Sequence, residues 1–337
     1  MKVGVFGATG QVGSVMRAIL VERNFPVDEI RFFASSRSAG QKLEFKGNQV
    51  VVEDADLADF TGIEVALFSC GATASKVLAP MVANSGAVVV DNSSAWRMDN
   101  DVPLIVPEVN GVEIKNVKKG IIANPNCTTM VAMPVLAPLH KEWGLKRMVA
   151  TTFQAVSGAG SAGVRELADQ VSNVGEDVSK LAFDGNAVDL GMSKVFPANV
   201  AFNVIPMAGS LVDDGSGDTN EETKLRDESR KILGIADLDV TATCTRVGVM
   251  TCHSLSITAW FKNEPNTQRA LDLLALAPSV ELVDIPTPLL AAGKDPSYVG
   301  RVRSHYSDPT QLSLFVSGDN LRKGAALNAV QIAELLL

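Results

Sequence analysis

The chain has 337 residues, of which 46% are hydrophobic and 20% charged, and its formal net charge is −8. This composition is typical of a globular protein, and the length predicts two domains, each with a full core. The negative charge disfavours nucleic acid and anionic membranes as partners, and no apolar run approaches the roughly 18 residues that span a bilayer. Four cysteines without metal-like spacing indicate free thiols in a reducing cytoplasm and no metal site.

The first part of the chain alternates short apolar strands with amphipathic helices, which is typical of a parallel sheet with crossover helices. The expected strands are 2–7, 29–34, 48–53, 64–69 and 86–91, with helices near 11–23 and 73–84. We therefore expect an α/β Rossmann-type domain over residues 1–126.

A glycine-rich turn, Gly7-Ala8-Thr9-Gly10-Gln11-Val12-Gly13, follows the first strand at once and opens the first helix. Glycines at this point let the backbone turn tightly and approach a pyrophosphate at the helix N-terminus. A literal G-x-G-x-x-G occurs at 158–163, but it lies in mid-chain without the short first βα unit of a nucleotide site. We expect that second segment to be a loop close to a ligand.

The second strand is followed by Ser35-Ser36-Arg37-Ser38, and no acidic residue occurs before Glu44. An arginine with flanking hydroxyls suits a 2′-phosphate, so NADP is favoured over NAD. The alternative is a solvated loop arginine. The small residues Ser69-Cys70-Gly71-Ala72-Thr73 after the fourth strand could wrap the cofactor or form an ordinary loop.

Cys127 stands at the junction between a short strand at 120–123 and a long apolar helical pattern that runs to about Glu142. Pro125 disfavours helix before it, and Asn126 is a natural N-cap, so Cys127 falls in the first helical turn. Free N–H groups and the helix dipole there favour a nucleophilic thiolate. The alternative is a small buried hydrophobic residue, and position alone leaves both open.

After Cys127 the strand candidates become longer, at 145–156 and 240–261, and they alternate Thr and Val. This pattern predicts an α+β domain with a mixed, largely antiparallel sheet over residues 127–319. The segment 320–337 is expected to be a helix that returns to complete the first domain. The polar loop at 213–218 suggests no function.

A cysteine nucleophile combined with a nicotinamide cofactor suggests aldehyde oxidation through a thioester. Such chemistry needs a base, and of the three histidines we favour His253, with His140 expected to be structural and His305 uncertain. Arg246 lies in an apolar strand pattern and is a candidate anion clamp. A bend near Gly248 could bring Arg246 and His253 to one site.

Three further charged residues could bind a substrate or phosphate. Glu221 and Lys224 open a predicted helix and share one of its faces. Arg97 follows a strand end. A solvated surface position is the alternative for each of these side chains.

Several motifs at consistent spacing resemble the aspartate-β-semialdehyde dehydrogenase family, over a match that runs from residue 3 to Glu334. They are Gly7-Ala8-Thr9-Gly10-x-Val12-Gly13, Arg37-Ser38-Ala39-Gly40, Val106-Pro107-Glu108-Val109-Asn110, Pro125-Asn126-Cys127, Gln154-Ala155-Val156-Ser157-Gly158, Cys244-x-Arg246 with His253, and Ser317-Gly318-Asp319-Asn320-Leu321-x-Lys323-Gly324-Ala325-Ala326.

The resemblance implies roles for individual residues. Cys127 carries the acyl-thioester, His253 is the acid/base and Gln154 orients the substrate. Other residues bind substrate or phosphate: Asn126, Arg246 and Glu221 for the substrate, and Arg97 and Lys224 for phosphate. The implied NADP contacts are Gly7, Thr9, Gly10, Gln11, Val12, Arg37, Ser38, Ser157, Gly158 and Asn320.

The resemblance further implies a homodimer that reduces L-4-aspartyl phosphate to the semialdehyde, on the route to lysine, threonine and methionine. One rival is a sister activity on another acyl phosphate, such as N-acetylglutamyl phosphate or glyceraldehyde phosphate, and Glu221 favours a substrate with a free amino group. A second rival is a non-catalytic NADP-binding regulator, which leaves Cys127, Gln154, Arg246 and His253 without a role.

Overall fold

A computed structural model describes all residues from 1 to 337. Its first half is a seven-stranded sheet in the order β3-β4-β2-β1-β5-β6-β7, parallel except for the pair β3 and β4. The strands are β1 (Lys2–Phe6), β2 (Glu29–Ala34), β3 (Lys42–Phe45), β4 (Asn48–Asp54), β5 (Val65–Phe68), β6 (Val88–Asp91) and β7 (Ile121–Ala123). The helices are α1 (Gln11–Glu22), α2 (Ala72–Asn84), α3 (Pro107–Asn110) and the 3₁₀ helix η1 (Gly111–Asn116). The predicted strands and helices of this half are confirmed, and the edge strand β3 was missed.

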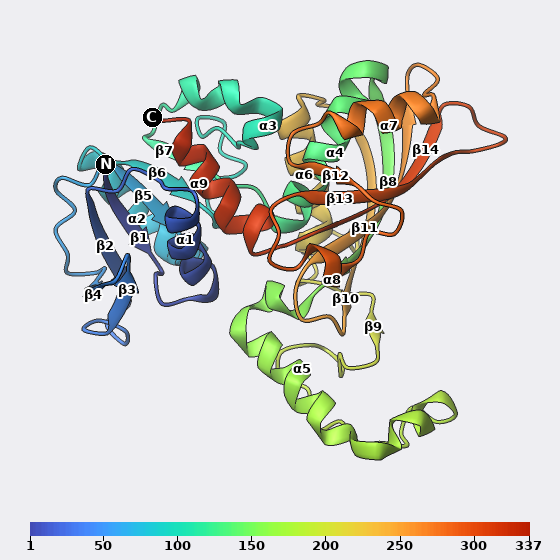
Figure 1. Cartoon of the computed structure of the whole chain (residues 1–337), viewed down its shortest axis with the longest axis horizontal. Helices are drawn as coiled ribbons and strands as arrows, with labels where there is room; N and C mark the ends of the chain where they lie inside the picture. Colours follow the sequence, from blue (N-terminus) through green and yellow to red (C-terminus); the bar gives the residue numbers. More distant parts are fainter.

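The second half is built on another seven-stranded sheet, in the order β12-β13-β14-β11-β8-β10-β9 (Figure 1). Most neighbours are antiparallel, but β8 and β10 are parallel, as are β12 and β13, so the sheet is mixed. Its strands are β8 (Leu145–Gln154), β9 (Val204–Ile205), β10 (Asp239–Val247), β11 (His253–Phe261), β12 (Val280–Leu282), β13 (Ser297–Ser304) and β14 (Gln311–Gly318). The predicted fold class is confirmed.

Helices pack around this sheet and join it to the first half. They are α4 (Cys127–Trp143), α5 (Gly160–Val174), α6 (Asn220–Leu233), α7 (Thr267–Ala275), α8 (Pro288–Ala291) and α9 (Leu327–Glu334), with the 3₁₀ helices η2 (Val156–Ala159) and η3 (Gly175–Ala182) and the π-helix η4 (Arg322–Ala326). Helix α4 is almost wholly buried and contacts α6, η4 and β11. No helix combines the length and apolar character needed to cross a bilayer.

The last helix, α9, lies against the first half of the chain (Figure 1). Its residues Leu327, Ala329, Val330, Ile332 and Ala333 belong to the same core cluster as β1 and α1. The chain therefore begins and ends in the nucleotide-binding half, and the second sheet is inserted between.

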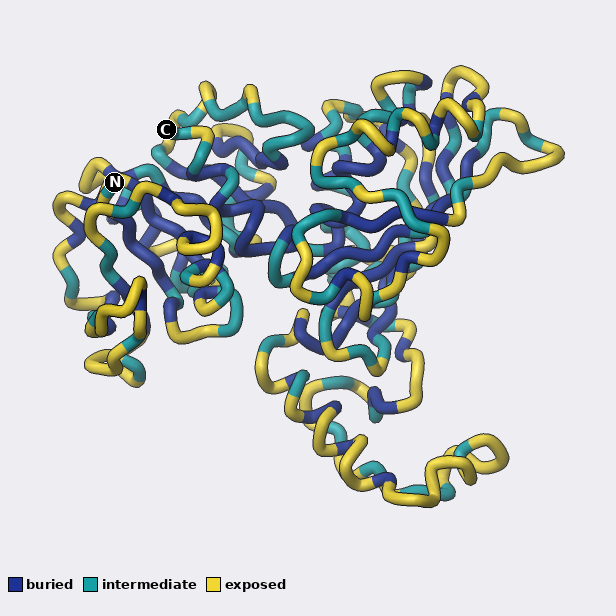
Figure 2. The backbone as a smooth tube through the Cα atoms, in the orientation of Figure 1, coloured by how far each residue is buried: buried dark blue, intermediate teal, exposed yellow.

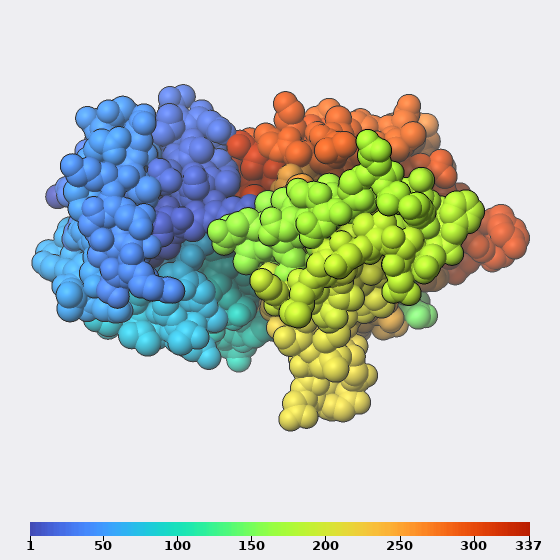
Figure 3. All heavy atoms as spheres, turned by 90° about the horizontal axis from the view of Figure 1, so that it is seen from below, coloured from blue at the N-terminus to red at the C-terminus, as the bar shows by residue number.

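The segment from α5 through η3 extends away from the rest of the molecule, and much of its surface is exposed (Figure 2). Seen from below, it covers one side of the second half, and the segment that follows it protrudes beyond it (Figure 3). Two large apolar side chains that follow this segment, Phe183 and Met192, are 93% and 82% exposed.

Candidate active site

Cys127 is the first residue of α4, which a three-residue connection separates from the end of β7. Asn126 has extended backbone angles, and its side-chain oxygen accepts a hydrogen bond from Thr128 N at 2.9 Å. The predicted N-cap is thus confirmed. The cap satisfies one free N–H group and fixes the position at which the thiol leaves the helix.

The C-terminal segment closes tightly over Cys127. A Cβ atom at Gly324, in the π-helix η4, would lie 3.1 Å from Cys127 Cβ. Asn124 anchors this segment, because its Nδ2 donates to Ala325 O at 2.9 Å and its Oδ1 accepts from Asn328 Nδ2 at 2.6 Å. A side chain at position 324 would therefore crowd Cys127 unless one of the two segments shifted.

Cys127 opens into a cavity of about 520 Å³ between the two halves of the chain. The predicted catalytic, substrate and phosphate residues all line it, together with one predicted cofactor contact: Arg97, Asn126, Cys127, Gln154, Gly158, Glu221, Lys224, Arg246 and His253. The strand pattern at 240–261 proves to be two strands, β10 and β11. Because they are joined by the turn at 248–252, Arg246 near the end of β10 and His253 at the start of β11 reach the same cavity.

Glu221, in the first turn of α6, is the centre of a polar network in this cavity. Its carboxylate accepts from Lys224 Nζ at 2.7 Å, from Gln154 Nε2 at 3.1 Å and from Asn126 Nδ2 at 3.2 Å. Burial alone would raise the pKa of Glu221, but Lys224 and the two amides outweigh it and lower the pKa to about 2. Glu221 is therefore a fixed negative charge at neutral pH.

His253 is fully buried, and its Nδ1 accepts a hydrogen bond from Ala155 N at 3.1 Å. The neutral ring therefore carries its hydrogen on Nε2, which has no partner within the protein. Burial and the nearby Arg246 charge lower the pKa of His253 to about 3. The ring is neutral at physiological pH and offers one unused donor.

Arg246 is also buried, and its Nη1 donates to Ala155 O at 2.6 Å while Nε has no partner. Its guanidinium lies over the ring of Phe196, 5.6 Å from the centroid. Gly158 makes room for this arrangement, since a Cβ there would lie 2.9 Å from Arg246 Nη1 and 3.2 Å from the His253 ring. An unsatisfied buried arginine is suited to bind an anionic ligand.

The thiol of Cys127 lies in a field of opposing charges. Burial and the negative charge of Glu221 raise its pKa to about 11, against the opposite influence of Arg97, Arg246 and Lys224. Burial and the Glu221 charge thus work against the thiolate that the position of Cys127 at the start of α4 favours.

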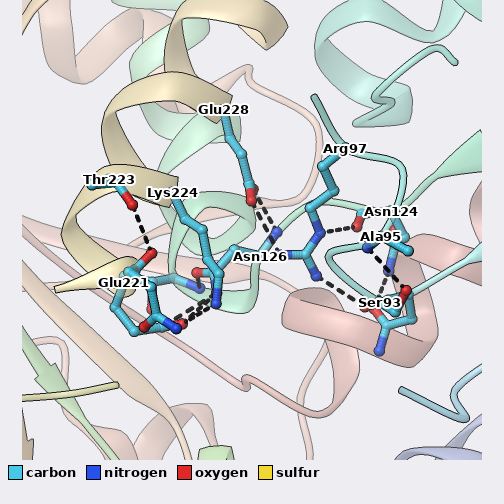
Figure 4. Close-up of polar contacts among 12 residues, drawn as sticks. Ser93, Ala95, Arg97, Asn124, Asn126, Glu221, Thr223, Lys224 and Glu228 are labelled. Carbon is cyan, nitrogen blue, oxygen red and sulfur yellow. Dashed lines mark hydrogen bonds and ion pairs between the residues drawn. The ribbon is translucent and has the colours of Figure 1, made fainter. Parts of the chain in front are cut away.

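Arg97 is buried, and its Nε donates to Asn124 O at 2.9 Å, its Nη1 to Glu228 at 3.1 Å and its Nη2 to Asn92 O at 2.9 Å (Figure 4). The surface alternative for Arg97 is therefore wrong. Sequence reasoning missed Glu228, although Glu221, Lys224 and Glu228 occur at i, i+3 and i+7 and so share one face of α6.

A second cavity, of about 360 Å³, lies at the carboxyl ends of β1 and β2 and is lined by Gly7, Thr9, Gly10, Ser35 and Arg37 among others. Both outer glycines are sterically required: Cβ atoms at Gly7 and Gly13 would each lie 2.3 Å from a carbonyl oxygen. Arg37 is exposed beside this cavity. The glycines allow a bound pyrophosphate to lie close to the backbone at the N-terminus of α1, and Arg37 lies at the rim of the cavity. This arrangement fits a dinucleotide that carries a 2′-phosphate.

The other predicted cofactor residues lie at or near these two cavities. Gln11 and Val12 begin α1, and Ser38 lies in the turn that contains Arg37. Asn320 Oδ1 accepts from Ser157 Oγ at 3.0 Å and from Cys252 N at 2.8 Å, so it ties η2 to the turn before His253. The expected loop at 158–163 is helical, since α5 begins at Gly160; only its first residues lie beside the ligand cavity.

Family comparisons agree with this arrangement. Residues 2–117 match the model of the semialdehyde dehydrogenase NAD binding domain, and residues 136–323 match that of the semialdehyde dehydrogenase dimerisation domain. An aspartate-semialdehyde dehydrogenase from Streptomyces akiyoshiensis is 61% identical over 336 residues, which cover 100% of this chain and 98% of that protein.

Two solved structures share the fold over nearly the full length. Aspartate semialdehyde dehydrogenase II from Vibrio cholerae, complexed with ASA, has a TM-score of 0.93 at 40% identity and covers 99% of this chain and 97% of its own. The enzyme from Candida albicans with NADP has a TM-score of 0.74 at 25% identity, with 99% and 98% covered. On this similarity, and with both cavities in place, the chain belongs to the aspartate-semialdehyde dehydrogenase family.

Proposed function

We propose that this chain catalyses the NADP-dependent reductive dephosphorylation of L-4-aspartyl phosphate to L-aspartate 4-semialdehyde, and the reverse reaction with inorganic phosphate. The observation that carries the proposal is the single cavity in which Cys127 lies with two sets of charged side chains, which meet at the Lys224–Glu221 ion pair. One set suits the α-amino and α-carboxylate groups of an aspartyl substrate, and the other suits a phosphate. The N-acetylated and glyceraldehyde rivals have no free amino group for Glu221.

Cys127 is the nucleophile. Its Sγ loses the thiol proton and forms a bond to the acyl carbon while the carbon–oxygen bond to phosphate breaks. The products are a thioester on Cys127 and free phosphate, which carries the proton away. The cofactor, when bound, supplies the hydride that reduces the thioester carbonyl. Release of the aldehyde then breaks the carbon–sulfur bond and returns the electron pair to Cys127.

Arg246 and Glu221 hold the two charged ends of the amino acid. Arg246 has an unpaired Nε and binds the α-carboxylate, while Glu221, a permanent anion, binds the ammonium group. Gln154 donates to Glu221 and orients the substrate from beside that carboxylate. Asn126 contacts Glu221 as well, which links the substrate subsite to the cap of the Cys127 helix.

Arg97 and Lys224 bind the phosphate. Three of the five N–H groups of Arg97 are engaged within the protein, which leaves two for phosphate oxygens. Lys224 lines the same cavity through its contact with Glu221. This arrangement supports phosphate as both leaving group and acyl acceptor.

His253 acts through Nε2. Because Ala155 N–H donates to Nδ1, the neutral ring offers Nε2–H to the oxygen or sulfur that gains negative charge. The acid/base role predicted from the sequence needs a second ring proton, which must displace the Ala155 contact. The pH dependence of the rate distinguishes these two roles.

The NADP contacts follow the residues predicted from the sequence. Gly7, Thr9, Gly10, Gln11 and Val12 hold the pyrophosphate at the start of α1. Arg37 and Ser38 hold the 2′-phosphate. Ser157, Gly158 and Asn320 hold the nicotinamide end beside the Cys127 cavity.

The functional form is a homodimer, located in the cytoplasm, in the biosynthesis of lysine, threonine and methionine. The match to a dimerisation domain over residues 136–323 supports self-association, as do the exposed Phe183 and Met192. The four free cysteines are consistent with a reducing compartment.

The test is NADPH formation from NADP, inorganic phosphate and L-aspartate-β-semialdehyde, with Cys127→Ser and NAD as controls. We expect phosphate-dependent turnover that disappears in the variant. Turnover only with N-acetylglutamate semialdehyde would show that the substrate is the N-acetylated one. No turnover with any aldehyde would favour the alternative of a non-catalytic NADP-binding regulator.

A further inference from the structure

Glu228 is a buried carboxylate behind two residues of the active-site cavity, Arg97 and Asn126, and the sequence analysis gave it no role. Its side chain is 1% exposed, and it lies on α6 one turn beyond Lys224. Both carboxylate oxygens are engaged: Oε1 accepts from Arg97 Nη1 at 3.1 Å, and Oε2 accepts from Asn126 N at 2.6 Å (Figure 4). A carboxylate withdrawn from water to this extent is costly unless its partners compensate it.

The two partners of Glu228 belong to different parts of the proposed reaction. Asn126 caps α4 and precedes the nucleophile Cys127, whereas Arg97 belongs to the loop after β6 and offers its remaining N–H groups to phosphate. The Glu228 carboxylate therefore binds both the backbone next to the nucleophile Cys127 and the Arg97 guanidinium that contacts the phosphate leaving group.

The other contacts of Arg97 strengthen this connection. Asn124 O, which accepts from Arg97 Nε, lies two residues before Asn126 on the same connection between β7 and α4. The guanidinium is thus held to that connection directly through Asn124 and indirectly through Glu228. Arg97 cannot reorient without losing three hydrogen bonds, so its two spare donors keep a fixed direction.

We propose that Glu228 is a positioning residue for phosphate transfer, which holds Arg97 and the N-terminus of α4 at a fixed separation. With this separation set, an acyl phosphate whose phosphate contacts Arg97 has its carbonyl carbon presented to Cys127 Sγ. Glu228 touches neither substrate nor cofactor in this role. The inference rests on the functions proposed above for Cys127 and Arg97.

The test is Glu228→Gln, which keeps the size of the side chain and one acceptor but cannot accept from both partners. The matched control is Asp227→Asn, the same chemical change one residue earlier, where the side chain is 34% exposed and pairs with Arg226. Both variants are assayed in the oxidative direction with phosphate, semialdehyde and NADP varied in turn.

We expect kcat/KM for phosphate to fall roughly 10- to 100-fold in Glu228→Gln, the loss that a misplacement of about 1 Å produces. The KM for NADP should stay within about twofold, since the cofactor cavity does not include Glu228. Asp227→Asn should match the wild type. A loss of activity spread equally over all three substrates would show that Glu228 only stabilises the fold, and would overturn the proposal.

A second comparison separates positioning from simple stability. Glu228→Asp keeps the charge but is shorter by one methylene, so it cannot reach both Arg97 and Asn126. If Glu228→Gln does not fold, the same kinetic comparison is made with Glu228→Asp. Combining Arg97→Lys with Glu228→Gln should add little to the loss caused by Arg97→Lys alone, because both act on the same contact. If the fold-losses of the two single variants instead multiply in the double variant, the two residues act independently and the proposal is refuted. If the wild-type protein itself shows no phosphate-dependent turnover, the proposed function is refuted rather than the role of Glu228.

Discussion

Glu221 should suppress the reactivity of Cys127 in the protein without ligand, so Glu221→Gln should increase it. With a pKa of about 11, roughly one thiol in 10⁴ is ionised at pH 7. Loss of a nearby like charge lowers a pKa by roughly 1 to 3 units, and Lys224 keeps its charge without its partner. Because thiolate nucleophilicity falls with pKa, each tenfold gain in thiolate gives only about a threefold gain in rate. We therefore expect alkylation at pH 7 to be roughly 3- to 30-fold faster.

The assay is the rate of iodoacetamide addition to Cys127, followed by mass spectrometry of its peptide from pH 6 to 10. Glu222→Gln is the matched control, because the Glu222 carboxylate faces Thr219 N and Cys244 N rather than the cavity. Glutamine also preserves its capping box. An equal rise in both variants, or slower alkylation in Glu221→Gln, would refute the charge argument.

Four further outcomes test the site and its support. With a His253 pKa of about 3, the ring stays neutral from pH 5 to 8, so the pH profile of kcat should show no inflection near pH 6.5. If the wild type does show such an inflection and a His253→Gln variant lacks it, His253 has the acid/base role. Gly158→Ala should lower kcat/KM at least about tenfold with little change in Tm, since its Cβ would press on two cavity side chains; wild-type kinetics would show that the site relaxes around it. Lys323→Met should cost about 3–5 kcal/mol of unfolding free energy in urea, because it leaves the buried carboxylate of Glu108 unpaired; a loss below about 1 kcal/mol would contradict that. Arg37→Ala should raise the KM for NADP far more than for NAD, and equal losses would show that it does not read the 2′-phosphate.

The strands of the first half could be predicted because parallel strands buried on both faces are short, apolar and separated by amphipathic helices. The edge strand β3 could not, since it is only four residues long, carries Lys42 and Glu44 on its exposed side and pairs on one edge only. The helix at 160–174 was missed for another reason: its glycine-rich start suggests a loop, and the helix depends on packing of its buried face.

The location of the site could be predicted because Cys127 follows a strand end, and because a bend near Gly248 could bring Arg246 and His253 together; the structure has a turn there, between β10 and β11. The protonation of the site could not. The pKa of Cys127 depends on its burial and on its distance from Glu221, and neither can be read from the sequence. Glu228 was missed because its only signal is its spacing from Glu221 and Lys224 on a polar helix, which places it on their face of α6 but does not show that it is buried.

The return of α9 to the first half has a consequence for how the protein is made. A ribosome that has completed residues 1–126 has not yet produced Leu327, Val330 and Ile332, which fill the core beside β1 and α1. The nucleotide-binding half therefore keeps an open apolar face until the inserted sheet and then α9 have been synthesised. The same late segment brings Gly324 against Cys127, so the surroundings of the thiol are incomplete until residues 320–326 have been synthesised.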